Sequence, residues 1–378
     1  MNYFFSLFLT LFFSVSCFAG ITTEVSLRDK IGQMLLIGFD GKQINNRSPI
    51  VKTIEDHNIG GVILFDYNFR TKTFDKNIEN PEQVKKLNHE LQYFAEQGNL
   101  KHHRVQLPLL ISVDYEGGQV NRLGEQYGFP PTLSAAEVGN RSVKEAETAA
   151  APMAHTLKMA EFNLDFAPEL DVNVNPDNPI IGKKNRSFSS DPKQVTRYAN
   201  IYSHHFLNQK IQCAYKHFPG HGSSTQDSHQ GFVDVTDTWR TYELEPFERA
   251  LNSPEACGVV MTAHIVNRQL DPSGLPATLS HKILTELLRN QLHFRGVIIT
   301  DDMQMKAISD NYGLEQALVL AINAGADMLI FGNNLSVPSQ DPIQVINIIE
   351  AKVHSGEISQ ERINEAYQHI VTLKESLN

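Results

Sequence analysis

The chain has 378 residues, 41% of them hydrophobic and 20% charged, and a formal net charge of −10 at pH 7. These proportions are typical of a soluble globular protein, and the length suffices for one large domain or two ordinary ones. The negative charge, without any cluster of Lys and Arg, excludes nucleic acid as a partner, since nucleic-acid binding depends on neutralising phosphates.

The chain opens with an uncharged run, Tyr3 to Ala19, rich in aromatic residues and Leu. A membrane span needs about 20 apolar residues, so the run is more typical of a signal-peptide core. Small residues near its end predict a signal peptide over 1–19 and a mature domain over 20–378, periplasmic or secreted, without a membrane span after processing. Two alternatives remain open: a lipoprotein with a lipid anchor at Cys17, and an uncleaved N-terminal anchor.

Eight short apolar runs follow, bounded by Gly or acidic residues, and most do not alternate with polar residues, as is typical of parallel strands buried on both faces. They span residues 34–41, 61–67, 109–115, 164–171, 211–217, 258–264, 296–301 and 327–332. Helical periodicity fills segments between them and after the last one, at 81–97, 143–160, 192–208, 280–291, 313–324, 342–354 and 360–377.

This alternation predicts an α/β fold, a single-domain (β/α)₈ TIM barrel. A doubly wound open sheet is the alternative, but no Gly-rich phosphate loop follows the first strand. Cys213 and Cys257 lie inside two of the apolar runs, and we expect buried free thiols there rather than a disulfide bridge.

Polar residues follow the predicted strands where a barrel places its active site. They are Asp40, Asp66, Asp114, Asp171, Lys216 with His217, His264, Asp301 and Asn333. Asp301 comes directly after an apolar strand, so its carboxylate is a candidate covalent nucleophile toward a sugar's anomeric carbon, or a metal ligand. A helix cap is the alternative for Asp301. Asp302 points to the opposite side and is interpreted as structural.

The segment from Lys216 to Gly222, followed by Asp227, Ser228 and His229, combines a strand end with a glycine-rich loop. A carboxylate beside an imidazole fixes the imidazole tautomer and raises its basicity, so Asp227 and His229 are candidates for acid–base catalysis. The histidine spacing fits no familiar zinc pattern, and we expect no metal. Lys216 and His217 are expected to donate hydrogen bonds to a hydroxylated ligand.

Two arginines, Arg122 and Arg186, lie among many acids and are interpreted as ligand-binding groups held by ion pairs. Asp114 would complement them by accepting hydrogen bonds from ligand hydroxyls. Trp239, the only tryptophan, lies in a polar stretch, so a long aromatic platform for sugars is not expected.

Together these motifs resemble glycoside hydrolase family 3, specifically its bacterial exo-β-N-acetylglucosaminidases. The resemblance extends from about residue 27 to 375 and is carried by Asp114 to Gly118, Phe166 to Asn173, Asn185 to Phe188, Lys216 to Gly222 with Asp227 to His229, Met261 to His264, and Thr300 to Met303. Tyr115 departs from the family, which often has Gln there.

The resemblance implies a retaining enzyme that removes terminal β-linked N-acetylglucosamine without a cofactor or metal. Asp301 would be the nucleophile, His229 the acid–base catalyst and Asp227 its orienting partner. The sugar would be held by Asp114, Arg122, Arg186, Lys216 and His217. Short members of the family usually act in the cytoplasm, so an exported copy favours peptidoglycan fragments or chitin oligosaccharides as substrate. A β-glucosidase, a non-catalytic sugar-binding protein of the same fold and a metal-dependent hydrolase remain as alternatives.

Overall fold

The computed structural model describes residues 25–335 and 339–377. The predicted signal peptide, its cleavage site and Cys17 lie outside the described residues. Within the described ranges, no helix combines the length and apolar character that crossing a membrane requires.

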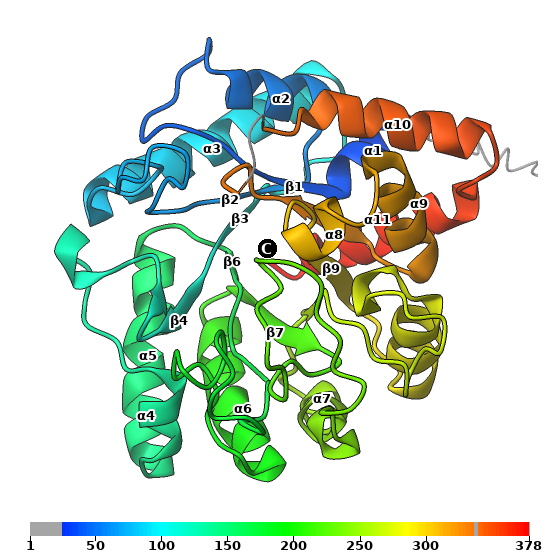
Figure 1. Cartoon of the computed structure of the whole chain (residues 1–378). Helices are drawn as coiled ribbons and strands as arrows, with labels where there is room; N and C mark the ends of the chain where they lie inside the picture. Colours follow the sequence, from blue (N-terminus) through cyan, green and yellow to red (C-terminus); the bar gives the residue numbers. More distant parts are fainter. Residues whose placement is uncertain (1–24, 336–338, 378) are drawn as a thin grey trace, which may run out of the picture.

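Eight parallel strands form a closed barrel that Figure 1 shows with helices around it. The strands are β1 (Leu35–Gly38), β2 (Gly61–Ile63), β3 (Leu110–Val113), β6 (Leu164–Asp165), β7 (Gln212–Phe218), β8 (Val259–Thr262), β9 (Val297–Asp302) and β10 (Met328–Phe331). Their order is β1–β10–β9–β8–β7–β6–β3–β2, and the pairing of Leu36 with both Gly61 and Ile330 closes the ring. The predicted (β/α)₈ barrel is confirmed.

The strands show no alternation of apolar and polar residues because both of their faces are buried, one toward the barrel interior and the other against the helices. Every residue of β1, β3, β7 and β10 is buried. That burial extends to polar side chains at the end of β7, where Lys216 and His217 are the last residues before Phe218. The apolar runs therefore carry charged groups into the protein at one end of the barrel.

The helices occupy the predicted segments and several shorter ones. They are α1 (Leu27–Gln33), α2 (Pro49–His57), α3 (Pro81–Lys101), α4 (Ala135–Gly139), α5 (Val143–Met159), α6 (Pro192–Asn208), α7 (Glu245–Leu251), η4 (Lys282–Gln291, of π type), α8 (Lys306–Ser309), α9 (Leu314–Ala324), α10 (Pro342–His354) and α11 (Gln360–Glu375), with short 3₁₀ turns η1 (Glu125–Tyr127), η2 (Thr241–Leu244) and η3 (Ala277–Leu279). The predicted start of α6 is confirmed, because the Asp191 side chain accepts from the Lys193 amide and Pro192 occupies the first turn.

The chain departs from the predicted pattern after β3. Residues Tyr115–Gly117 (β4) leave the barrel and pair antiparallel with Val120–Asn121 (β5). The turn needs glycine at Gly117, where φ is +91° and an added Cβ would lie 2.2 Å from the Leu133 carbonyl oxygen. The residues that follow β3 thus form a separate two-stranded sheet outside the barrel.

Cys213 and Cys257 form a disulfide, so the expectation of free thiols is wrong. Cys213 lies in β7 and Cys257 just before β8, and these strands are hydrogen-bonded neighbours with Ala214 opposite Val259. The register brings the two Cα atoms within 4.9 Å, although 44 positions separate the cysteines in sequence. Apolar surroundings indicated burial, but only the strand pairing shows that the two thiols face each other.

Candidate active site

The predicted site residues gather at the carboxyl ends of the barrel strands. Asp114 follows β3, Arg122 follows β5, Arg186 precedes α6, Lys216 and His217 end β7, Asp227 and His229 lie in the loop after β7, and Asp301 ends β9. In a parallel barrel these ends share one face, which is where the strand-to-helix loops form a pocket.

Arg186 is buried and held by two glutamates. Its Nε and Nη2 donate to the two carboxylate oxygens of Glu116 at 2.8 and 2.7 Å, and Nη2 lies 2.5 Å from Glu169. Burial alone would lower the pKa of Arg186, but Glu116 and Glu169 raise it well above its usual range. The guanidinium is therefore a fixed positive charge that anchors the floor of the site.

Lys216 continues this network toward Asp114. Its buried ammonium lies 2.6 Å from Glu116 and 3.1 Å from Asp114. Burial would lower the pKa of Lys216, yet Glu116 and Asp114 raise it above its usual value. An ammonium has three donor hydrogens. After one hydrogen bond to Glu116 and one to Asp114, one donor remains for a ligand.

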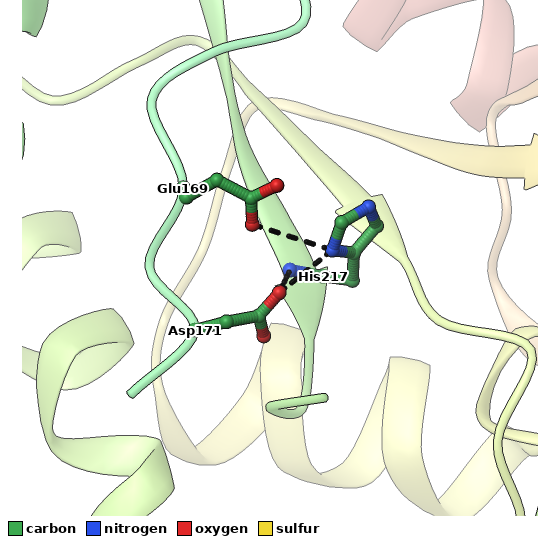
Figure 2. A group of neighbouring side chains, drawn as sticks. All are labelled: Glu169, Asp171 and His217. Atoms are coloured by element: carbon green, nitrogen blue, oxygen red, sulfur yellow. Dashed lines mark hydrogen bonds and ion pairs between the residues drawn. The ribbon is translucent and has the colours of Figure 1, made fainter. Parts of the chain in front are cut away.

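His217 is bound on one side only, as Figure 2 shows. Its Nδ1 donates to Asp171 at 2.7 Å and lies 3.4 Å from Glu169. Burial lowers the pKa of His217, but Glu169 and Asp171 outweigh burial and raise it to about 10. The ring is thus an imidazolium at neutral pH, and its Nε2 has no hydrogen-bond partner in the described part of the chain, which leaves an oriented donor for a ligand.

Glu169, Asp171 and His217 also offer three ligand atoms within 4.8 Å of one another, a spacing that a metal ion could use. The present contacts are those of an ion-pair network, since Nδ1 of His217 carries the proton shared with Asp171 and Arg186 neutralises Glu169. A cation would have to displace that proton and sit beside a guanidinium. The donor set therefore fits a charged hydrogen-bond network better than a metal.

Asp301 ends β9 with its side chain partly exposed at the barrel mouth. One carboxylate oxygen accepts the Asp302 amide at 2.8 Å. Burial by itself would raise the pKa of Asp301, but the imidazoles of His264, His217 and His229 lower it to about 2. An ionised, accessible carboxylate is the state that a nucleophile toward an electrophilic carbon requires.

His229 and Asp227 form the predicted dyad on the loop after β7. Asp227 accepts from both the ring Nδ1 and the backbone amide of His229, at 2.8 and 2.9 Å. Burial raises the pKa of Asp227, but His229 outweighs it and lowers the pKa to about 2. With Nδ1 bound to a carboxylate, Nε2 is the ring atom left for proton transfer, and 44% of the His229 side chain is exposed.

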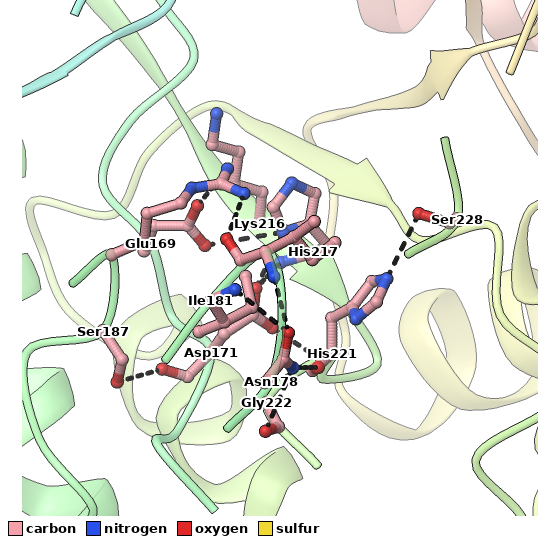
Figure 3. A network of polar contacts seen from close by, with 12 residues as sticks. Glu169, Asp171, Asn178, Ile181, Ser187, Lys216, His217, His221, Gly222 and Ser228 are labelled. Atoms are coloured by element: carbon pink, nitrogen blue, oxygen red, sulfur yellow. Dashed lines mark hydrogen bonds and ion pairs between the residues drawn. The ribbon is translucent and has the colours of Figure 1, made fainter. Parts of the chain in front are cut away.

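The loop that carries the dyad is fixed at its base by hydrogen bonds. Asn178 donates to the carbonyls of His221 and Gly222 at 2.8 and 3.2 Å, and the His221 amide donates to Asp171 at 2.7 Å. Figure 3 shows this base and the contact from His221 Nε2 to the Ser228 hydroxyl, 3.3 Å long. His221 thus helps to hold the base of the loop.

The tip of the loop contacts α8, the helix that follows the strand bearing Asp301. The Ala307 amide of α8 donates to the Ser228 carbonyl at 3.3 Å, and α8 follows β9 directly in the chain. His229 is also among the groups that lower the pKa of Asp301. The loop that carries the candidate acid–base group therefore contacts the helix that follows the strand of the candidate nucleophile.

Glu116 and Glu169 are functional residues that sequence reasoning did not single out. Each lies two positions from a predicted strand-end aspartate, Asp114 and Asp171 respectively. Period-two spacing places such residues on the same side of an extended backbone, and this was the available signal. Arg122 is placed less tightly than expected, since its guanidinium lies 3.9 Å from Asp114 and 29% of its side chain is exposed.

Charged and hydrogen-bonding side chains gathered at the strand ends of a (β/α)₈ barrel are the arrangement of an enzyme of this fold class. The chain belongs to glycoside hydrolase family 3, because residues 26–373 match the glycosyl hydrolase family 3 N-terminal domain.

Similar proteins include the beta-hexosaminidase LpqI of Mycobacterium tuberculosis, 30% identical over 364 residues that cover 94% of this chain and 84% of LpqI. Beta-hexosaminidase A of Pseudoalteromonas piscicida is 32% identical over 86% of this chain, which spans about half, 54%, of that relative's length. The solved family 3 β-N-acetylglucosaminidase of Paenibacillus sp. str. FPU-7 superposes with a TM-score of 0.82 at 33% identity, over 93% of this chain and 63% of that one.

Proposed function

We propose that this glycoside hydrolase is a retaining exo-β-N-acetylglucosaminidase that removes terminal, non-reducing, β-linked N-acetylglucosamine. The observation that carries the proposal is the joint placement of ionised Asp301 and the Asp227-bound imidazole of His229. The names of the relatives support N-acetylglucosamine as the released sugar. A β-glucosidase and a non-catalytic sugar-binding protein of the same fold are the alternatives.

Catalysis proceeds in two steps through a covalent glycosyl-enzyme. An Asp301 oxygen forms a bond to the anomeric carbon as the glycosidic bond breaks, and His229 Nε2 gives its proton to the leaving oxygen. His229 then accepts a proton from water, whose oxygen attacks the anomeric carbon and releases Asp301. Retaining glycosidases commonly use a second carboxylate for this proton, whereas here an imidazole takes that role.

The floor of the site supplies the hydrogen bonds that hold the terminal sugar. Lys216, Arg122 and Nε2 of His217 act as donors to its hydroxyl oxygens, and Asp114 accepts from a hydroxyl. Arg186 acts through Glu116 and Glu169, which fix Lys216 and His217 in place. Because these charges are paired before substrate arrives, little reorganisation is required on binding.

The proposed natural substrates are peptidoglycan fragments or chitin oligosaccharides, and the proposed location is the periplasm or the exterior. The disulfide between Cys213 and Cys257 supports export, since disulfides persist in oxidising compartments. Determining the N-terminal residue of protein recovered from each cell fraction tests this. We expect an exported chain that begins at Gly20, or at a lipidated Cys17, whereas a cytoplasmic chain with Met1 intact would contradict export.

Hydrolysis of 4-nitrophenyl β-N-acetylglucosaminide, measured beside the 4-nitrophenyl β-glucoside with and without EDTA, tests the proposed activity. We expect release of 4-nitrophenol from the N-acetyl substrate, at least tenfold weaker release from the glucoside, and no effect of EDTA. Preference for the glucoside would favour the β-glucosidase. Activity abolished by EDTA and restored by a divalent cation would return Glu169, Asp171 and His217 to consideration as a metal site.

A further inference from the structure

His264 is a buried histidine just past the carboxyl end of β8, and the proposed catalytic steps do not use it. Strands β8 and β9 are parallel neighbours, and their last paired residues are Met261 and Ile299. β9 continues beyond that pair to Asp301 and Asp302. On this side of β9, a side chain from beyond the end of β8 takes the place of the strand pairing.

That side chain is the His264 imidazole, whose Nε2 lies 3.0 Å from the Asp302 carbonyl oxygen. A carbonyl oxygen only accepts hydrogen bonds, so Nε2 carries the ring proton and is the donor. The amide of the same residue, Asp302, donates to an Asp301 carboxylate oxygen at 2.8 Å. Asp302 thus links His264 to the candidate nucleophile, because its carbonyl is held by the imidazole and its amide holds the Asp301 carboxylate.

The other ring nitrogen of His264 is bound to a threonine hydroxyl. Nδ1 lies 2.8 Å from Thr278 Oγ1, which in turn lies 2.7 Å from Thr262 Oγ1. Burial lowers the pKa of His264, so the ring is neutral at neutral pH and its unprotonated Nδ1 accepts from the Thr278 hydroxyl. The ring therefore has a single proton, and its neighbours direct that proton toward Asp302.

We propose that His264 is a positioning residue for Asp301, which sets the place of the nucleophilic carboxylate through the backbone of Asp302. This inference rests on the proposed function, because it takes Asp301 as the nucleophile. Reacting atoms must lie about 3–3.5 Å apart, and a misplacement of about 1 Å costs on the order of 10²-fold in rate. The buried ring reaches the reaction only through Asp302, so its loss should lower kcat and leave KM nearly unchanged.

Three substitutions at His264 separate this contact from the general effect of losing a buried ring. A glutamine amide reaches about as far as Nε2 and can still donate to the Asp302 carbonyl, whereas an asparagine amide reaches only about as far as Nδ1, and leucine has no donor. On 4-nitrophenyl β-N-acetylglucosaminide, kcat should fall about 10–100-fold in His264→Leu and His264→Asn, but less than about threefold in His264→Gln. KM should change by less than about threefold in all three.

Thr278→Val tests the same ring from its other side. Valine keeps the shape of threonine but removes the hydroxyl that orients the imidazole, so kcat should fall by about threefold to tenfold with KM unchanged. Thr196→Val is the matched control, because Thr196 is a buried threonine on α6 whose hydroxyl donates to the Pro192 carbonyl at 2.9 Å. It should leave both constants unchanged.

Hydrogen–deuterium exchange, followed by mass spectrometry, tests the backbone link without relying on activity. Peptides that cover the end of β9 should exchange faster in His264→Asn than in wild type, because the Asp302 carbonyl has lost its donor. They should exchange as in wild type in His264→Gln. Peptides from β1, which pairs with β10 and β2 rather than with β9, should be unchanged in both variants.

Equal losses of kcat in His264→Gln and His264→Asn would overturn the inference, and so would a wild-type kcat in His264→Asn. A higher KM with an unchanged kcat would overturn it as well, since His264 would then act on sugar binding. Thermal unfolding shows which variants are folded, and the glutamine–asparagine comparison decides if His264→Leu is not.

Should wild type release nothing from the substrate, the proposed function fails. Exchange then decides whether His264 holds the end of β9. Faster exchange in His264→Asn alone supports that contact, and unchanged exchange refutes it.

Discussion

Replacing Asp301 with alanine is expected to lower kcat on 4-nitrophenyl β-N-acetylglucosaminide by on the order of 10⁴–10⁶, the scale seen when an enzyme loses its covalent nucleophile. The side chain would no longer offer an oxygen to the anomeric carbon, so the glycosyl-enzyme could not form. Steady-state kinetics on purified protein measures the effect. Trapping of the wild-type intermediate by mass spectrometry should show the sugar attached at Asp301.

The fold should survive this substitution, because Asp301 is partly exposed and its one backbone contact is to its own neighbour, Asp302. Asp310→Ala provides a matched control, since Asp310 is an exposed carboxylate at the end of α8 in the following segment. Thermal unfolding of both variants should resemble that of wild type. Activity like that of wild type in Asp301→Ala would remove Asp301 from the nucleophile role.

Adjacent aspartates show why Asp301, rather than Asp302, takes this role. The Asp302 carboxylate accepts the Gln304 amide at 3.0 Å and packs against Gly332, and burial raises its pKa to about 7. Asp301 faces three histidines and stays ionised down to about pH 2. Loss of activity between pH 3 and 6 would therefore not arise from protonation of Asp301.

The barrel was predictable from sequence because each strand is an apolar run that ends at Gly or a polar residue. The β4–β5 hairpin was not, since Tyr115 falls inside the predicted strand 109–115 and periodicity does not show that the chain leaves the barrel after Val113. The disulfide also required the β7–β8 register. Such features depend on contacts between segments far apart in the chain, which local periodicity does not report.

The residues of the site that lie at strand ends were also predictable from sequence, whereas the ion pairs between them were not. Asp301, Lys216 and His217 lie at strand ends, where the fold alone dictates convergence. The ion pairs that organise the site, from Glu116 and Glu169 to Arg186, join residues up to 70 positions apart. The cluster of Tyr67, Phe69 and Phe74 was not predictable, because the three rings are dispersed in a polar segment and meet only in the folded chain, while the single tryptophan, Trp239, is buried.

Replacing His229 with alanine is expected to affect substrates according to their leaving groups. Chitobiose has a sugar alkoxide as leaving group and needs a proton, so its kcat/KM should fall by about 10²–10⁴, the usual contribution of a positioned general acid. The 4-nitrophenolate ion leaves without protonation, so kcat/KM on the aryl glycoside should fall far less. Its kcat should still drop, because the second step has lost the base that activates water.

His204→Ala is the matched control for His229→Ala. His204 is an exposed histidine on α6 whose Nδ1 lies 2.7 Å from Glu255, a pair that resembles the one between His229 and Asp227 but belongs to the outer helical layer. It should leave both rates unchanged. Equal losses on chitobiose and the aryl glycoside in His229→Ala would argue against an acid role, because a positioning role would not distinguish the two leaving groups.

Asp227→Asn separates proton transfer from loop geometry. Asparagine keeps an oxygen that can accept from the His229 amide and Nδ1, so the loop should retain its shape. The negative charge that favours a positively charged ring during proton transfer would be lost. We therefore expect the pH optimum for chitobiose hydrolysis to move to lower pH, with the reduction in rate smaller than in His229→Ala. An unchanged optimum would make Asp227 a structural residue of the loop rather than the partner that tunes the catalyst.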